Sequence, residues 1–139
     1  MTLVRDAMVT SPVMLAASAT AQEAGECLTT PDVRAVLVCE ADGTLVGVVT
    51  RKTLVREVVA KGLDPGRTEL VSFAEPPIYV LEAATPLDEA FHELEERDLE
   101  RVPVVEDGRL VGVLSRAVVQ RRLAEDEPPV DDDESVGVA

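Results

Sequence analysis

An internal repeat constrains the fold of this chain more than any other feature of its sequence. The segment at 42–51, DGTLVGVVTR, returns at 107–116 as DGRLVGVLSR, with seven of ten positions identical. Upstream, RAVLV at 34–38 matches RVPVV at 101–105, and residues 11–13 match residues 76–78. The offset stays between 65 and 67, so two copies of one unit account for the chain to about residue 124.

Each copy predicts a strand, a helix, two strands and a second helix. Apolar runs after prolines, at 13–15 and 78–81, are typical of buried strands. Thr20 with Glu23 fits a capping box, and Pro86 is expected at the first position of the matching helix, after Thr85. In the second copy, residues 107–108 (Asp-Gly) lie between two apolar runs and predict a two-residue hairpin turn.

The second helix of each copy is expected to start after Thr50 and Ser115, which are good N-caps. In the first copy it ends near Gly62, which suits a left-handed closing residue. The predicted fold class is therefore α/β (α+β), with two β-α-β-β-α repeats. We expect repeat 1 over 1–66, repeat 2 over 67–124, and a solvated acidic tail over 125–139. Residues 62–68 are expected to form the linker across the boundary of the repeats.

Composition excludes several classes of protein. With 46% hydrophobic residues the chain can build a core, and a net charge of −14 disfavours nucleic-acid binding. The sequence has no apolar run long enough to span a membrane. Two cysteines and one histidine are too few for a disulfide scaffold or a common zinc site, so we expect no metal and a cytoplasmic protein. His92 lies among glutamates on a helix, and no nucleophile–base pair is apparent, so we expect no enzyme.

The repeated DGxLVGV block, the RVPVVE segment before its second copy and the spacing of the copies resemble a tandem pair of CBS domains (a Bateman module) in a stand-alone protein. The resemblance covers residues 1–124. It implies two units packed about a pseudo-twofold axis with a crevice on each side. It also implies adenosine-type ligands such as AMP, ADP, ATP or S-adenosylmethionine, and dimerisation of the pair, often into a disc.

The helix starts at Thr50 and Ser115 direct free N–H groups at one spot, which favours an anion. The expected first crevice combines Arg34, Val48, Thr50, Arg51, Thr53, Ile78 and Tyr79, although Tyr79 suits a core position equally well. The expected second, weaker crevice combines Val13, Arg101, Val113, Ser115, Arg116 and Val118. The family pattern implies a ribose-binding Asp three residues after the hydroxyl, where this chain has Thr53 and Val118. We therefore expect weakened nucleotide binding, with the first crevice preferred.

Two functions follow from these features. The first is a regulatory module that binds an adenosine-type nucleotide or similar small anion between the repeats and signals to a protein partner, which the sequence does not identify. The alternative is a structural dimerisation or interaction module with vestigial crevices, since apolar residues on the second helices suit a homodimer. Those residues are Leu54, Val55, Val58, Val59, Val119 and Leu123.

Overall fold

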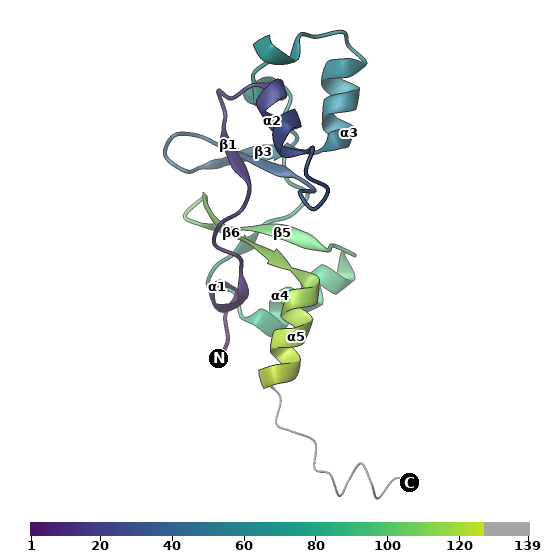
Figure 1. Cartoon of the computed structure of the whole chain (residues 1–139). Helices are drawn as coiled ribbons and strands as arrows, with labels where there is room; N and C mark the ends of the chain where they lie inside the picture. Colours follow the sequence, from purple (N-terminus) through teal and green to yellow (C-terminus); the bar gives the residue numbers. More distant parts are fainter. Residues whose placement is uncertain (127–139) are drawn as a thin grey trace, which may run out of the picture.

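The computed structural model describes residues 1–126 (Figure 1). The first half contains β1 (Met14–Ala16), α2 (Ala21–Cys27), β2 (Val36–Cys39), β3 (Leu45–Val49) and α3 (Arg51–Leu54), which continues as a π-helical turn over Val55–Val59. The second half contains β4 (Leu81–Glu82), α4 (Leu87–Glu96), β5 (Arg101–Glu106), β6 (Arg109–Ser115) and α5 (Arg116–Asp126). The short helix α1 (Val4–Ala7) precedes both, and 3₁₀ turns at Pro65–Arg67 and Leu70–Ser72 lie between them. The predicted α/β class and element order are confirmed.

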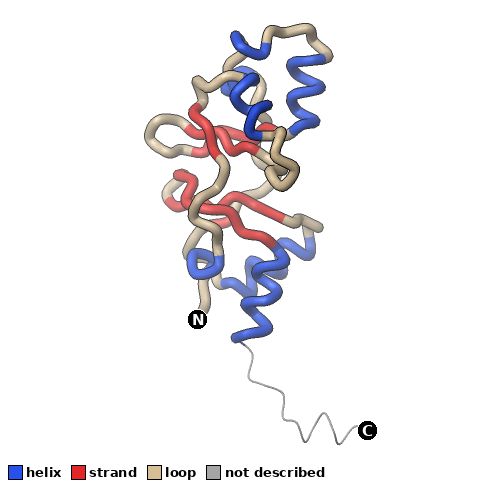
Figure 2. Tube along the Cα trace, viewed as in Figure 1, coloured by secondary structure: helices blue, strands red, loops and turns tan. Residues whose placement is uncertain are grey.

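Each half forms one three-stranded sheet with the same topology. β1 runs parallel to β2, and β2 is antiparallel to β3; β4, β5 and β6 repeat this arrangement. Both sheets lie in the middle of the molecule, and the longer helices lie toward its two ends (Figure 2). Asp107 and Gly108 have φ angles of 54° and 78°, as a tight hairpin requires, so the predicted turn is confirmed. The acidic tail falls outside the described residues, except that Glu125 and Asp126 end α5.

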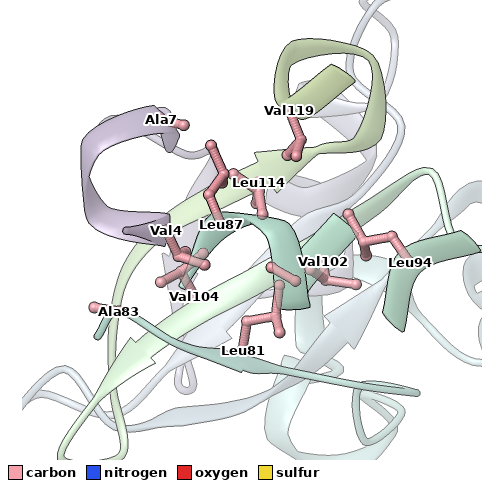
Figure 3. Packing of buried hydrophobic residues seen from close by; sticks show 11 residues of the cluster. Val4, Ala7, Leu81, Ala83, Leu87, Leu94, Val102, Val104, Leu114 and Val119 are labelled. Carbon is pink, nitrogen blue, oxygen red and sulfur yellow. The ribbon is translucent and has the colours of Figure 1, made fainter. Parts of the chain in front are cut away.

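Two segments are exchanged between the halves. Residues 2–9 pack on the second half, where Val4 is fully buried beside Leu87 and Val104 (Figure 3). Residues 68–75 pack on the first half, where Leu70 is fully buried. We call these stretches the exchanged segments. The two exchanged segments occupy equivalent positions in the repeat, at an offset of 66 residues, and we call such equivalent residues twins. Each half is therefore completed by the stretch of chain that precedes the first strand of the other half.

The exchanged segments also start the helices. The Thr20 capping box is confirmed, with hydrogen bonds of 2.9 and 3.2 Å to and from Glu23. Helix α4, however, begins at Leu87 with Pro86 as its N-cap, so the expected Pro86 position is wrong by one residue. The Leu87 N–H donates to the Thr2 carbonyl at 2.9 Å, and the exchanged segment thus supplies the cap that a local side chain was expected to give.

The strand expected over 78–81 is shorter than predicted, because β4 begins only at Leu81. Ile78 is 87% exposed, so its apolar side chain does not mark a core strand. An apolar run alone does not distinguish a buried strand from a surface segment.

Candidate functional site

A cavity of about 430 Å³ lies where the two halves meet. Its walls come from the chain before β1, the loop before β2, the strands of both sheets and the start of α5. The lining residues are Val9, Ser11, Pro12, Val13, Asp32, Val33, Arg34, Ala35, Leu37, Val48, Arg101, Val102, Pro103, Val113, Ser115 and Val118. The lining is mostly apolar, with a few polar groups, which is the usual character of a small-molecule site.

Two arginines supply positive charge at this cavity. Arg34 precedes β2 and Arg101 begins β5, so they are twins in the repeat. Neither guanidinium has a carboxylate within 4.0 Å among the described residues. In a chain of net charge −14, two arginines on one cavity form a local attraction for an anion.

Ser115 lies at the start of α5, and its Oγ accepts a hydrogen bond from the Val118 N–H at 3.3 Å. Its hydroxyl proton remains able to donate toward the cavity. Val118, one turn into the helix, adds an apolar wall. Of the residues expected in the second crevice, Val13, Arg101, Val113, Ser115 and Val118 line this cavity together. Arg34 and Val48, expected in the first crevice, line the same cavity.

Arg51 and Arg116 are twins that hold loops and do not line the cavity. Arg51 donates to the backbone carbonyls of Leu28 and Thr30, at 2.5 and 2.9 Å. Arg116 pairs with the carboxylates of Glu100 and Asp98, the latter at 3.4 Å. The loop fixed by Arg51 leads to Arg34, and the loop fixed by Arg116 leads to Arg101. Arg51 and Arg116 were expected to reach an anion, but they instead fix the loops that lead to Arg34 and Arg101.

The remaining expectations for the first crevice centre on Thr50 and Thr53. Thr50 Oγ1 accepts from the Thr53 N–H at 3.2 Å, while the Thr50 N–H donates to Thr53 Oγ1 at 3.1 Å. Thr53 is buried, and its hydroxyl donates to Glu75 Oε1 at 3.2 Å. Glu75 also pairs with Arg56. The hydrogen bond to Glu57, followed by the charge of Glu75, raises the pKa of Arg56 above its ordinary value.

Tyr79 and Ile78 lie apart from the cavity lining. Tyr79 packs against the core of the second half, with the Arg97 guanidinium 4.1 Å from its ring centroid. That stacking is a cation–π contact. The exposed Ile78 side chain forms no buried wall.

Sequence reasoning missed Asp32, which supplies the one carboxylate among the lining residues. It lies in the loop between α2 and β2, two residues before Arg34. The sequence feature that could have indicated Asp32 is its position two residues before Arg34, which the repeat identifies. Val9 was missed because its segment belongs to the second half only after the exchange.

The CBS domain family model matches this chain twice, at residues 4–60 and 70–125. The chain is a member of the CBS domain family. Hypoxic response protein 1 of Mycobacterium tuberculosis is 31% identical over 125 residues, covering 90% of this chain and 87% of that protein. A crystal structure of Hypoxic Response Protein I with two coordinated zinc ions superposes with a TM-score of 0.74 at 30% identity, covering 88% of this chain and 99% of that one. Staphylococcus aureus OpuCA shares the fold at 22% identity, with a TM-score of 0.71 over 87% of this CBS chain and 98% of its own.

The zinc ions belong to that relative. Across residues 1–126 of this CBS chain, no three His, Cys, Asp or Glu side chains gather closely enough to hold a metal ion. In the same part of the chain, no helix has the length and apolar character needed to cross a membrane.

Proposed function

We propose that this CBS pair is a regulatory module that binds an adenosine-type nucleotide, or a similar small anion, in the cavity between its halves. The observation that carries the proposal is the pair of equivalent arginines, Arg34 and Arg101, which form no ion pair within residues 1–126 and lie on an apolar cavity lined by both halves. A ligand there contacts both repeats, so it stabilises one arrangement of the halves over others. A protein partner then senses that arrangement.

The residues suggest how such a ligand lies. Its anionic group faces Arg34, Arg101 and the Ser115 hydroxyl, since charge-assisted hydrogen bonds are the strongest available there. Its apolar ring lies between aliphatic side chains such as Val48 and Val113. Asp32 provides a carboxylate that can accept hydrogen bonds from ribose hydroxyls, a role that Val118 cannot perform.

Relatives in the family support the ligand class. One structural neighbour is a CBS domain pair in complex with 5′-methylthioadenosine and S-adenosyl-L-methionine, at 20% identity to this chain. CBS pairs act generally as regulatory or sensor modules, which fits a binding role over a catalytic one. The proposed compartment is the cytoplasm, where thiols such as those of Cys27 and Cys39 stay reduced.

Calorimetric titration and thermal melts with AMP, ADP, ATP and S-adenosylmethionine test the proposal. Arg34→Gln and Arg101→Gln each keep much of the side-chain length but remove the charge, and each should weaken binding about tenfold or more. Arg121→Gln, an arginine of α5 outside the cavity lining, is the matched control and should bind as the wild type does. Absence of heat and of any melting shift with all four ligands would overturn the proposal.

The alternative, a dimerisation module, is favoured by one surface. Val55 and Val59 on the π-helical turn are 59% and 68% exposed, and Leu63 just after it is 45% exposed. We propose that this apolar face meets the same face of a second chain in a homodimer. Sedimentation velocity of Val59→Glu should then show monomers, whereas Val71→Glu, at an exposed valine elsewhere, should leave the dimer intact. A wild-type monomer at all concentrations would exclude this use.

A further inference from the structure

Glu75 and Val9 occupy equivalent positions in the two halves. Val48 of β3 exchanges two backbone hydrogen bonds with Glu75, at 2.8 and 3.0 Å. Its twin Val113 of β6 exchanges two with Val9, at 2.9 and 3.0 Å. Each exchanged segment therefore lays one residue along the outer strand of a sheet, next to the start of the following helix.

The side chains at these equivalent positions differ in character. Val9 lines the cavity together with Val118, one turn into α5. In the other half, Glu75 hydrogen-bonds to Thr53, which is the twin of Val118. The same carboxylate also pairs with Arg56. Two valines in the second half thus correspond to a hydrogen-bonded acid and hydroxyl in the first.

The contacts of Glu75 with Thr53 and Arg56 occupy groups that would otherwise bind an anion. The Thr53 hydroxyl proton goes to Glu75, and the Arg56 guanidinium is shared between Glu57 and Glu75. The Thr50 hydroxyl oxygen lies 3.0 Å from Thr53 Oγ1 and also accepts a hydrogen bond from the Thr53 N–H in the first turn of α3. The Glu75 carboxylate lies 3.2 Å from Thr53 Oγ1, so a phosphate bound at this helix start would have a carboxylate beside it, and like charges at close range oppose binding.

We infer that Glu75 closes the first crevice to anionic ligands, so that each chain carries one anion site, at the cavity lined by Val9 and Val118. This inference rests on the proposed function for the site itself, but it assigns a new role to Glu75. The half-exposed carboxylate takes the hydrogen bond of the Thr53 hydroxyl that a ligand would otherwise receive. The two halves then differ in function although their strands and helices correspond.

Exchange of the two equivalent side chains tests the inference, with AMP as the probe in calorimetric titration. The wild type should bind one AMP per chain. Glu75→Val should bind two, since the first crevice then resembles the second, and Val9→Glu should weaken binding at least tenfold. Glu75→Gln keeps the shape and a hydrogen-bond acceptor but removes the charge, so it should also gain a second, weaker site. Circular dichroism melts establish that each variant is folded.

The outcomes separate this inference from the proposed function. Two AMP per wild-type chain would overturn the closure by Glu75 and leave the proposed function standing. One AMP in the wild type and in both folded Glu75 variants would also overturn the closure. Should the wild type bind none while a Glu75 variant binds one, the closure holds and the proposed function fails for AMP. No binding to any of these proteins would overturn both.

Discussion

The Gly43 carbonyl accepts a hydrogen bond from the Leu110 N–H at 3.0 Å, which joins the hairpin turns of the two halves. Its twin runs in the opposite direction, from the Leu45 N–H to the Gly108 carbonyl at 3.2 Å. This reciprocal pair joins equivalent turns of the two repeats. It depends on the backbone shape of the turns, because Gly43 has a φ of +92° and Gly108 a φ of +78°.

Gly43→Ala should therefore destabilise the protein by about 1–2 kcal/mol, the cost of a left-handed backbone with a Cβ. Chemical denaturation measures this change. Gly25→Ala is the control, since Gly25 lies inside α2, where an added methyl group would meet its nearest neighbour at an ordinary 3.9 Å, and it should stabilise by roughly 0.5–1 kcal/mol. Equal effects of the two substitutions would contradict the role of the turn.

Val4→Ala should lower the stability of the second half. Val4 is fully buried against that half's core although it lies at the N-terminus of the chain, so truncating it removes about 1.5–3 kcal/mol of apolar burial and leaves a cavity. Hydrogen exchange should show faster opening in α4 and β6 than in α2 and β3. Met1→Ala, at a 98% exposed side chain, should change neither.

The twin anchors Arg51 and Arg116 should respond differently to salt. Arg116 is held by carboxylates that are largely exposed, so Arg116→Gln should cost under about 1 kcal/mol at low salt and almost nothing at about 1 M NaCl, where the Debye length falls to roughly 3 Å. Arg51 is held by carbonyls, so the roughly 1 kcal/mol cost of Arg51→Gln should persist at high salt. Thermal melts at both salt concentrations compare the two. Identical salt profiles would show that the anchors are equivalent after all.

Val118→Asp should weaken binding of AMP if the ligand lies as proposed, with its ribose hydroxyls on Asp32 and its anionic group beside Ser115. A carboxylate one turn into α5 would then lie close to that anionic group, and like charges at close range oppose binding, by about tenfold or more. Val118→Asn provides a neutral control of the same shape and should lose less. Calorimetric titration compares the three proteins. Stronger binding of AMP to the Asp variant would place the ribose beside α5 and not on Asp32.

Acid should weaken the first hairpin turn through Asp42. The backbone N–H of Thr44 donates to this carboxylate at 2.9 Å and holds the pKa of Asp42 below its ordinary 3.8. The stabilisation is present above pH 3.8 and is lost as the pH falls through the lower pKa of the folded state. Asp42→Asn keeps an acceptor but cannot ionise. The difference in melting temperature between wild type and variant, measured from about pH 6 to about pH 2, should shrink toward zero at the acid end, and a constant difference would contradict this origin.

Local signals in the sequence predicted local structure well. The Thr20 capping box and the turn at Asp107 both depend on residues within a few positions, and both are present as expected. The exchange of segments was not predictable in this way. Residues 2–9 contact residues far along the chain, as in the hydrogen bonds between Val9 and Val113, and no pattern of neighbouring residues encodes such a contact.

For the candidate site, too, the repeat predicted some residues, whereas contacts made by the exchanged segments were not predicted. The repeat marked Arg34, Arg101 and Ser115, and the structure brings them to one cavity, although their role toward a ligand stays a prediction. The sequence favoured the first crevice as the ligand site, and the contact of Glu75 with Thr53 was not predicted. Its carboxylate reaches Thr53 only because an exchanged segment passes there, and no spacing in the sequence encodes that contact.

The exchange of segments also couples the folding of the two halves. Synthesis of Val9 precedes that of its hydrogen-bonding partner Val113 by most of the described chain. The residues around Val9 therefore stay without these hydrogen bonds until β6 has been made. Neither half is complete without a segment from the other side of the linker, so both halves reach their final form in a common last step of folding.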